Sequence, residues 1–332
     1  MRKRVSLQRS ITLSVLSIGL LYGAFGLAYA YWQTKHSFHA AIGLGFQELA
    51  RQSADKVGLI LDREIEWVER LSSLPEVREA VREGTRLTFK QPALRRWKES
   101  QRPYFRSLVI LDRQGRSVGG ATSETTRAYY KRQPWWPVLF EQRRSWVGEL
   151  HLDEMGHGHL EVAVPIVDEA DSVLGALKTV IERDQLLTSV LRSRIGDTGH
   201  VMLVGPQGTV LACPLLSPGQ HTALMGQLRD TAAWMEVQDD AHGQGGGIIG
   251  FASVALRPGI VQTEMWSILV RQDPNETYAP LRLLMWKLAA FGILAIAVVA
   301  CSDGASVAAL CSQSMRWSSE CSFWDSRAAR SR

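Results

Sequence analysis

Three histidines and two acidic residues lie within nine positions of the chain, as His151, Asp153, Glu154, His157 and His159. Imidazole and carboxylate groups are good ligands for zinc, nickel or copper. The same stretch contains two glycines and lies between strand-like segments, which is typical of a polar hairpin turn. Because no second group of ligands stands out elsewhere in the sequence, we interpret the stretch as a turn and predict no metal site and no cofactor.

Motifs for other chemistries do not stand out. We find no Gly-x-Ser-x-Gly nucleophile turn, no His-Glu-x-x-His motif and no paired catalytic Cys and His. The glycine run at 243–247 lacks the Lys-Ser/Thr ending of a phosphate loop. Lys and Arg (38) outnumber Asp and Glu (33), but they are spread along the chain, so nucleic acid is not an expected partner. We expect no catalysis by the residues present.

Two apolar segments near the ends of the chain are long enough to span a bilayer, which takes about 20 mostly apolar residues in a helix. No charge interrupts the chain from Ser10 to Thr34, and only Lys287 lies within Leu283–Cys301. The residues before the first segment include several basic side chains and no acidic one, which favours a cytoplasmic N-terminus. We predict transmembrane helices at 11–32 and 283–301.

This topology makes a two-pass protein of the inner membrane, with the lipid bilayer as a partner. The basic end at 1–10 and the tail at 302–332 would be cytoplasmic, and residues 35–282 periplasmic or extracellular. Two alternatives remain open at this point. The first segment could be a signal peptide cleaved near Ala28-Tyr29-Ala30, and the second could be a buried helix of a soluble core.

Between the two segments the pattern predicts an α+β fold. Apolar residues recur with a helical period over 35–88 and indicate one long helix, with a break at Pro75; two or three separate helices are the alternative. Further on, β-rich runs alternate with turns and suggest two related modules in tandem, each with an antiparallel sheet. The predicted strands cover residues 107–112, 117–118, 159–167, 173–181, 199–204, 209–212, 250–255 and 265–271.

The external region resembles the double Cache family of extracytoplasmic sensor domains, whose modules have PAS-like sheets. The resemblance rests on four stretches and on their order between two apolar segments. The stretches are Leu108–Gly115, Gln133-Pro134-Trp135-Trp136, Ile195–Val204 with Gly208–Pro214, and Trp266–Pro274 with Tyr278–Arg282. The resemblance implies a membrane-distal module at 35–190, which includes the long helix, and a membrane-proximal module at 191–280. It also implies a small-molecule ligand in the distal module and a homodimer.

The family's ligand pattern can be placed on this sequence residue by residue. Trp135 and Trp136 match its aromatic pair, and Asp153 matches its Asp. His151 stands in place of the family's Tyr, and Gln133 in place of an Arg that holds a carboxylate. The resemblance therefore implies a ligand site that contains these five residues, together with the neighbouring Tyr130 and Arg132.

Two departures from the pattern bear on the ligand. Gln133 offers neutral donors where a guanidinium would bind a carboxylate through two bonds. Val180 stands where an Asp would bind the ligand's amine. A plain α-amino acid is therefore disfavoured, although Arg127, Lys131 and Arg132 could supply positive charge from another direction. The alternative is that both tryptophans only pack the sheet.

Residues 302–332 are rich in serine and continue no helical pattern. The layout resembles that of histidine kinases, diguanylate cyclases and chemotaxis transducers, and the resemblance implies an amphipathic helical relay at this point, which the tail does not supply. We interpret the tail as a truncated or frame-disrupted end, with a disordered tail as the alternative. The predicted function is a membrane-anchored sensor. The alternatives are the remnant of a kinase or cyclase, and a tethered scaffold without a ligand.

Overall fold

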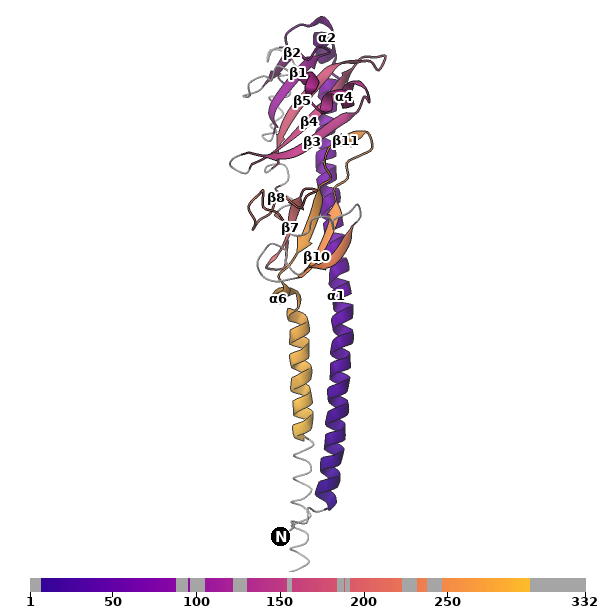
Figure 1. Cartoon of the computed structure of the whole chain (residues 1–332), viewed down its shortest axis with the longest axis vertical. Coiled ribbons are helices and arrows are strands. Elements are labelled where there is room, and N and C mark those ends of the chain that lie inside the picture. Colours follow the sequence, from indigo (N-terminus) through magenta and orange to yellow (C-terminus); the bar gives the residue numbers. More distant parts are fainter. Residues whose placement is uncertain are drawn as a thin grey trace, which may run out of the picture. The chain divides into compact units, whose positions relative to one another are not determined.

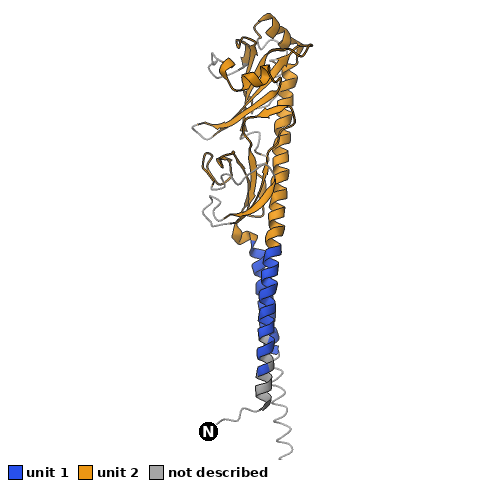
Figure 2. Cartoon of the chain, turned by 45° about the vertical axis from the view of Figure 1, so that its right-hand side comes forward, with its two compact units in different colours: residues 1–37, 278–332 blue, residues 38–277 orange. Residues whose placement is uncertain are grey.

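The computed structural model describes residues 7–87, 95, 105–121, 130–153, 157–183, 188, 192–222, 232–237 and 247–298. The chain divides into two compact units, one formed by residues 38–277 and the other by residues 1–37 and 278–332 (Figure 2). The tail at 302–332, the end of the second apolar segment at 299–301, and Gly243–Gly246 of the glycine run lie outside the described residues.

Two helices begin the chain. Helix α1 covers Leu7–Ser72, so the predicted long helix is continuous with the first apolar segment. Helix α2 covers Pro75–Glu83 and begins on proline, which suits the first turn of a helix because its missing N–H is not needed there. It ends at Gly84, whose φ of 68° is the left-handed conformation common after a helix. The break predicted at Pro75 is confirmed.

The first sheet has six strands in the order β11-β3-β4-β5-β1-β2. The hairpins predicted around 107–118 and 159–181 are confirmed, whereas β3 and β11 were not predicted. A short 3₁₀ helix, η1, and helix α4 connect β2 to β3. The bounds are β1 Phe105–Asp112, β2 Ser117–Ala121, η1 Tyr130–Arg132, α4 Trp135–Phe140, β3 Ser145–Leu152, β4 Gly158–Val167, β5 Val173–Glu182 and β11 Ile260–Gln262.

Aspartate side chains form two of the hairpin turns of this sheet. Asp112 accepts hydrogen bonds from the backbone N–H groups of Gln114 (2.9 Å) and Arg116 (2.8 Å). Asp168 likewise accepts hydrogen bonds from the backbone N–H groups two and four residues after it, those of Ala170 (2.9 Å) and Ser172 (2.8 Å). An Asp carboxylate that bonds to the backbone ahead of it favours a turn over a continued strand. This local chemistry explains why both hairpins could be predicted.

The second sheet has the strand order β6-β7-β12-β10-β9, with β8 paired to β7. Its hairpin around Gly205–Gly208 and its last two long strands are confirmed, and the rest was not predicted. Helix α6, Pro274–Thr277, follows β12. The strand bounds are β6 Arg194–Ile195, β7 Gly199–Val204, β8 Val210–Ala212, β9 Ala233–Val237, β10 Gly247–Ser253 and β12 Ser267–Arg271. With its helices and two sheets, the chain is α+β, as predicted.

The later half of α1 runs beside both sheets (Figure 1). A β-carbon on Gly250 of β10 would lie 2.1 Å from the carbonyl carbon of Phe46, so only glycine permits this approach to α1. Against the first sheet, the ring of Trp67 contacts Phe105 at the start of β1, with centroids 5.0 Å apart. The buried residues of α1 include Phe46, Ala50, Ala54, Val57, Leu61, Glu64, Ile65, Val68 and Leu71.

One strand crosses from one sheet to the other. Residues 254–266, here called the crossover segment, leave the second sheet after β10 and return to it at β12. Within the segment, β11 pairs in parallel with β3 of the first sheet. The first sheet therefore differs from the antiparallel sheet that was predicted. The parallel direction is possible because no hairpin connects the two strands.

The other unit, formed by residues 1–37 and 278–332, contains apolar helical segments. Among the described residues, one helix is long and apolar enough to span a membrane, Ala279–Val298, with a mean hydropathy of 1.9. Its large side chains are exposed, as Trp286 and Phe291 illustrate. Large apolar side chains are also exposed in the first part of α1, among them Leu21 and Phe25.

The close contact between β10 and α1 predicts the cost of adding a methyl group there. Gly250→Ala should destabilise the protein by about 1–3 kcal/mol, because the new carbon overlaps the backbone of Phe46 and the helix or the sheet must move. Gly45→Ala is the matched control, since a β-carbon there has nothing within 4 Å. It should stabilise the helix by up to about 1 kcal/mol. Chemical unfolding of the full chain in detergent measures both, and equal effects would contradict this packing.

Candidate functional site

The first sheet presents two faces to different helices. Val81 of α2 lies against Gly175 of β5, while the next residue, Ala176, belongs to a buried cluster that α4 forms on the sheet. Because successive residues of a strand point to opposite faces, α2 and α4 lie on opposite sides of the sheet. We call the side covered by α4 the α4 face. Its cluster consists of Val109, Leu111, Tyr130, Trp135, Val138, Leu139, Trp146, Ala163 and Ala176.

Aromatic rings dominate one end of the α4 face. Trp135 is fully buried, and its ring lies 6.2 Å from that of Tyr130 and 5.6 Å from that of Trp136. Trp136 is half-buried and stacks on Phe140, with centroids 4.2 Å apart. The indole N–H of Trp135 has no hydrogen-bond acceptor in the described part of the chain. A buried donor without an acceptor is costly, so this group is suited to binding an acceptor atom of a ligand.

An ion pair occupies the middle of the same face. Lys178 of β5 lies between Val109 and Ala163 in the strand register, and both of these residues belong to the cluster around Trp135. The Nζ of Lys178 lies 2.6 Å from the Oε1 of Glu161 on β4, and only 13% and 26% of the two side chains are exposed. The face therefore has one cation and one anion, largely withdrawn from water, next to the aromatic cluster.

A polar group closes the other end of the face. Two residues before Glu161 on β4, the Nε2 of His159 lies 2.9 Å from Nη1 of Arg106 and 3.2 Å from Oδ2 of Asp153. Asp153 also accepts a hydrogen bond from the backbone N–H of His157 at 2.8 Å. This bond shapes the turn between β3 and β4, as the sequence predicted. Among the described residues, no group of three or more His, Cys, Asp and Glu is arranged to hold a metal ion.

One carboxyl group beside this end has a raised pKa. Glu264 lies two residues beyond β11. Burial raises its pKa, the carboxylate of Glu149 on β3 raises it further, and His151 lowers it. Glu264 therefore accepts a proton at a higher pH than an ordinary glutamate does, because its charged form is both desolvated and repelled by Glu149.

Solved structures share the fold of this chain. The chain superposes on the ligand-binding domain of the amino acid chemoreceptor PctB of Pseudomonas aeruginosa PAO1 in complex with L-Arg. The TM-score is 0.51 and the identity 16%, over 72% of this chain and 97% of that one. For the domain of PctC from the same organism, in complex with GABA, the TM-score is 0.50 and the identity 18%, over 68% of this chain and 97% of that one. For the domain of CtaA from Pseudomonas fluorescens, in complex with L-isoleucine, the TM-score is 0.50 and the identity 15%, over 74% of this chain and 97% of that one.

The fold is that of a Cache-type extracytoplasmic sensor domain. The resemblance read from the sequence is thereby confirmed for the fold. No family model matches the chain, and no curated protein sequence does.

Within this Cache fold, the predicted site residues fall into two groups. Tyr130, Trp135 and Trp136 lie together at the aromatic end. Asp153 lies at the polar end with His159, which is four residues from Ala163 along β4, or about 13 Å at the usual rise of a strand. The structure therefore does not bring the tryptophans and Asp153 into one contact group. The charged pair lies between them.

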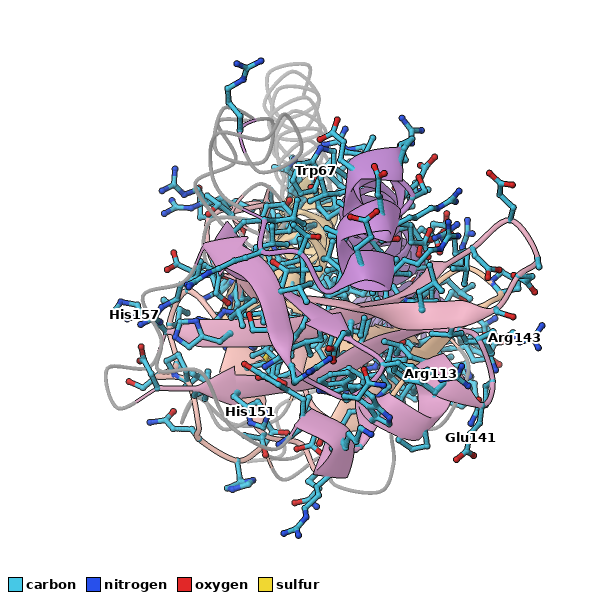
Figure 3. The ribbon with its side chains drawn as sticks, turned by 90° about the horizontal axis from the view of Figure 1, so that it is seen from above. Trp67, Arg113, Glu141, Arg143, His151 and His157 are labelled. Carbon is cyan, nitrogen blue, oxygen red and sulfur yellow. The ribbon has the colours of Figure 1, made fainter. Side chains whose placement is uncertain are left out.

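The remaining residues predicted for the site belong to neither group. His151 is exposed near the end of β3 (Figure 3). In the strand register it pairs with His159 of β4. Arg132 is exposed on η1. Gln133 is half-buried in the turn before α4, where its backbone N–H donates to the carbonyl of Tyr130 and its carbonyl accepts from Trp136. Glu154 and Arg127 lie outside the described residues.

Sequence reasoning missed the two charged residues at the centre of the face. Val180, which was compared with the family's amine-binding Asp, lies on this face between Ser107 and Glu161 in the register. Lys178 lies two residues before it. The available signal was a charge inside the apolar run of each strand, Glu161 in β4 and Lys178 in β5, of opposite sign; a further acid, Glu182, ends β5. A lone charge in such a strand needs a partner if it is buried.

The ion pair predicts how stability changes when one partner is removed. Lys178→Met should destabilise the full chain in detergent by about 1–3 kcal/mol, because Glu161 is left largely buried without its cation. The double variant Lys178→Met/Glu161→Leu should recover most of this loss, because no charge then needs a partner.

The control is an exposed ion pair between Arg143 and Asp171. Arg143 is labelled in Figure 3, on the side of the view away from His157. Arg143 Nη1 lies 3.0 Å from Asp171 Oδ2, with both side chains more than half exposed. Arg143→Met should change the free energy of unfolding by less than about 1 kcal/mol. A double variant at Lys178 and Glu161 that is no more stable than the single one would contradict the proposed burial of the pair.

Proposed function

We propose that the chain is a membrane-anchored extracytoplasmic sensor, which binds a small molecule on the α4 face and transmits a conformational signal to the membrane. The observation that carries the proposal is the arrangement of that face. It combines a buried aromatic cluster, an indole N–H without an acceptor among the described residues, and a shielded pair of opposite charges. A few polar groups placed against an apolar surface are the usual composition of a small-molecule site.

The membrane anchoring is supported by the exposed apolar side chains of the two helical segments. Leu21, Phe25, Trp286 and Phe291 are each more than 70% exposed. Lipid would cover them, and the basic residues before the first segment favour a cytoplasmic N-terminus. In this proposal residues 11–32 and 283–301 are the two membrane helices, and the unit at 38–277 lies outside the cytoplasm.

The charges of the α4 face define the compounds to be tested. Lys178 and Glu161 supply the cation and the anion that Gln133 and Val180 lack. Zwitterionic ligands therefore belong in a screen beside organic acids, amines and purines. The ligands named for PctB, PctC and CtaA are amino acids and belong to those proteins.

A thermal-shift screen of the full chain in detergent tests the binding proposal. A compound that binds only the folded protein stabilises it by about 2.7 kcal/mol at 100 times its Kd. We expect at least one compound class to raise the melting temperature, and Trp135→Phe to reduce that shift because it removes the indole N–H. Trp266→Phe is the matched control: this tryptophan is equally buried, but it precedes β12 of the second sheet. Its ligand-induced shift should equal that of the wild type.

If no compound class shifts the melting temperature, the protein is a scaffold and not a sensor. If Trp266→Phe reduces the shift as strongly as Trp135→Phe does, the site is not on the α4 face. Either result overturns the proposal.

The proposed sensor works as a homodimer. Leu44 and Leu59 are exposed on α1, at 57% and 70%, and a second copy of the helix could cover them. Light scattering of the full chain in detergent, corrected for the bound detergent, should give the mass of two copies. A monomer at micromolar concentration would contradict the dimer.

A further inference from the structure

The crossover segment, residues 254–266, extends the first sheet. Val261 of β11 pairs with Trp146 of β3 in the parallel register. The backbone N–H of Thr263 donates to the carbonyl of Val147 at 3.0 Å. From the other side, Nη2 of Arg144 donates to the carbonyl of Ile260 at 3.2 Å. The second half of the segment is therefore held by hydrogen bonds along β3.

The first half of the segment is held on α1. The backbone N–H of Arg257 donates to the carboxylate of Asp62, at 3.1 and 3.2 Å from its two oxygens. The guanidinium of the same arginine pairs with Glu69, whose other oxygen accepts the hydroxyl of Ser145 at 2.5 Å. One carboxylate of α1 thus joins the crossover segment to the first residue of β3.

The segment also contacts the α4 face. Val261 packs against the buried cluster that contains Trp135 and Trp146. Among the partly buried apolar residues packed against this cluster in the described structure, it is the one that lies outside residues 105–183. If the aromatic cluster moves, it therefore displaces Val261, a residue that lies in the chain between two strands of the second sheet, β10 and β12.

At its other end, the segment is continuous with the second sheet. The backbone N–H of Val254 donates to the carbonyl of Trp266 at 2.8 Å, which joins the two ends of the segment at the sheet. Beyond Trp266 the chain enters β12, which lies between β7 and β10. After β12 the chain continues through α6 into the apolar helix Ala279–Val298.

We propose that the crossover segment is a strap that couples the α4 face to β12, so that a change around Trp135 alters the second sheet through Val261 and β11. The role of this coupling in sensing rests on the proposed function. The coupling itself is a property of the fold and needs no ligand. Its physical basis is that β11 is shared: it cannot follow β3 and the aromatic cluster without moving the two ends of the segment at β10 and β12.

Helix α1 offers a second route between the sheets, since it contacts both. The two routes differ in the side of the sheet at which they begin. The strap begins at the α4 face, whereas α1 is reached from the opposite face, where Leu108 of β1 is fully buried. A test must therefore compare a perturbation on each face, with the strap attached and with it released.

Hydrogen exchange of the full chain in lipid nanodiscs provides this test. Trp135→Phe perturbs the α4 face, and Leu108→Ala perturbs the opposite face. Thr263→Pro releases the strap, because proline lacks the N–H that bonds to Val147. The readout is the exchange rate of the backbone amides of β12, Ser267–Arg271.

We expect Trp135→Phe to speed exchange in β12 several-fold with the strap attached, and to add little in the Thr263→Pro background. The effect of Leu108→Ala on β12 should be the same in both backgrounds. Val261→Ala, which removes most of the side chain that packs against the aromatic cluster, is a second way of uncoupling the strap if Thr263→Pro does not fold.

Two results would overturn the strap. One is an effect of Trp135→Phe on β12 that is equally large in both backgrounds, which assigns the coupling to α1. The other is no effect of Trp135→Phe on β12 when the strap is attached. Because the measurement uses no ligand, a failed ligand screen leaves it unchanged, and a failed strap leaves the proposed ligand site standing.

Discussion

The fold depends on burying one side of the later half of α1, a stretch of about seven helical turns from Phe46 to Leu71. Neither sheet covers that side alone, and each sheet buries one of its own faces there. The contact is close because small residues allow it. Ala50 and Ala54 lie on the helix, and Gly250 lies on β10. At Gly58 a β-carbon would lie 2.5 Å from the carbonyl oxygen of Ala255, so the crossover segment also depends on a glycine.

This constraint determines where a ligand site can form. In the described residues, the helices α1 and α2 occupy one face of the first sheet, and the proposed site is on the other face, where α4 lies with its tryptophans. Burying Lys178 and Glu161 costs desolvation energy, which their mutual attraction offsets only in part. A costly pair beside an aromatic cluster is easier to explain by binding than by stability.

Local chemistry made part of this structure predictable from the sequence. Asp112 and Asp168 each bond to the turn that follows them, so the pattern around them specified two hairpins. Pro75 marked the break between α1 and α2. In contrast, β3 lacks a regular alternation because its pairing with β4 shifts between Val147 and Leu150. Strand β11 has only three residues, and its partner is more than a hundred positions away. Its place depends on tertiary contacts that no local pattern contains.

The same division holds for the site. Two adjacent tryptophans were visible as candidates, and the fold places them in one cluster with Tyr130. The pairing of Lys178 with Glu161 depends on the register of β4 against β5, which a single sequence does not reveal. Asp153 was assigned to the same site by resemblance. Its bonds to the backbone N–H of His157 and its contact with His159 place it at the far end of the face, in a turn.

The central claim is that the α4 face binds a small molecule. Its most direct test is a crystal structure of the protein with the compound that stabilises it most. The account predicts the compound on the α4 face, with an acceptor atom within hydrogen-bond distance of the Trp135 indole nitrogen and a polar group at Lys178 or Glu161. A compound bound to the second sheet, with the α4 face unchanged, would contradict it.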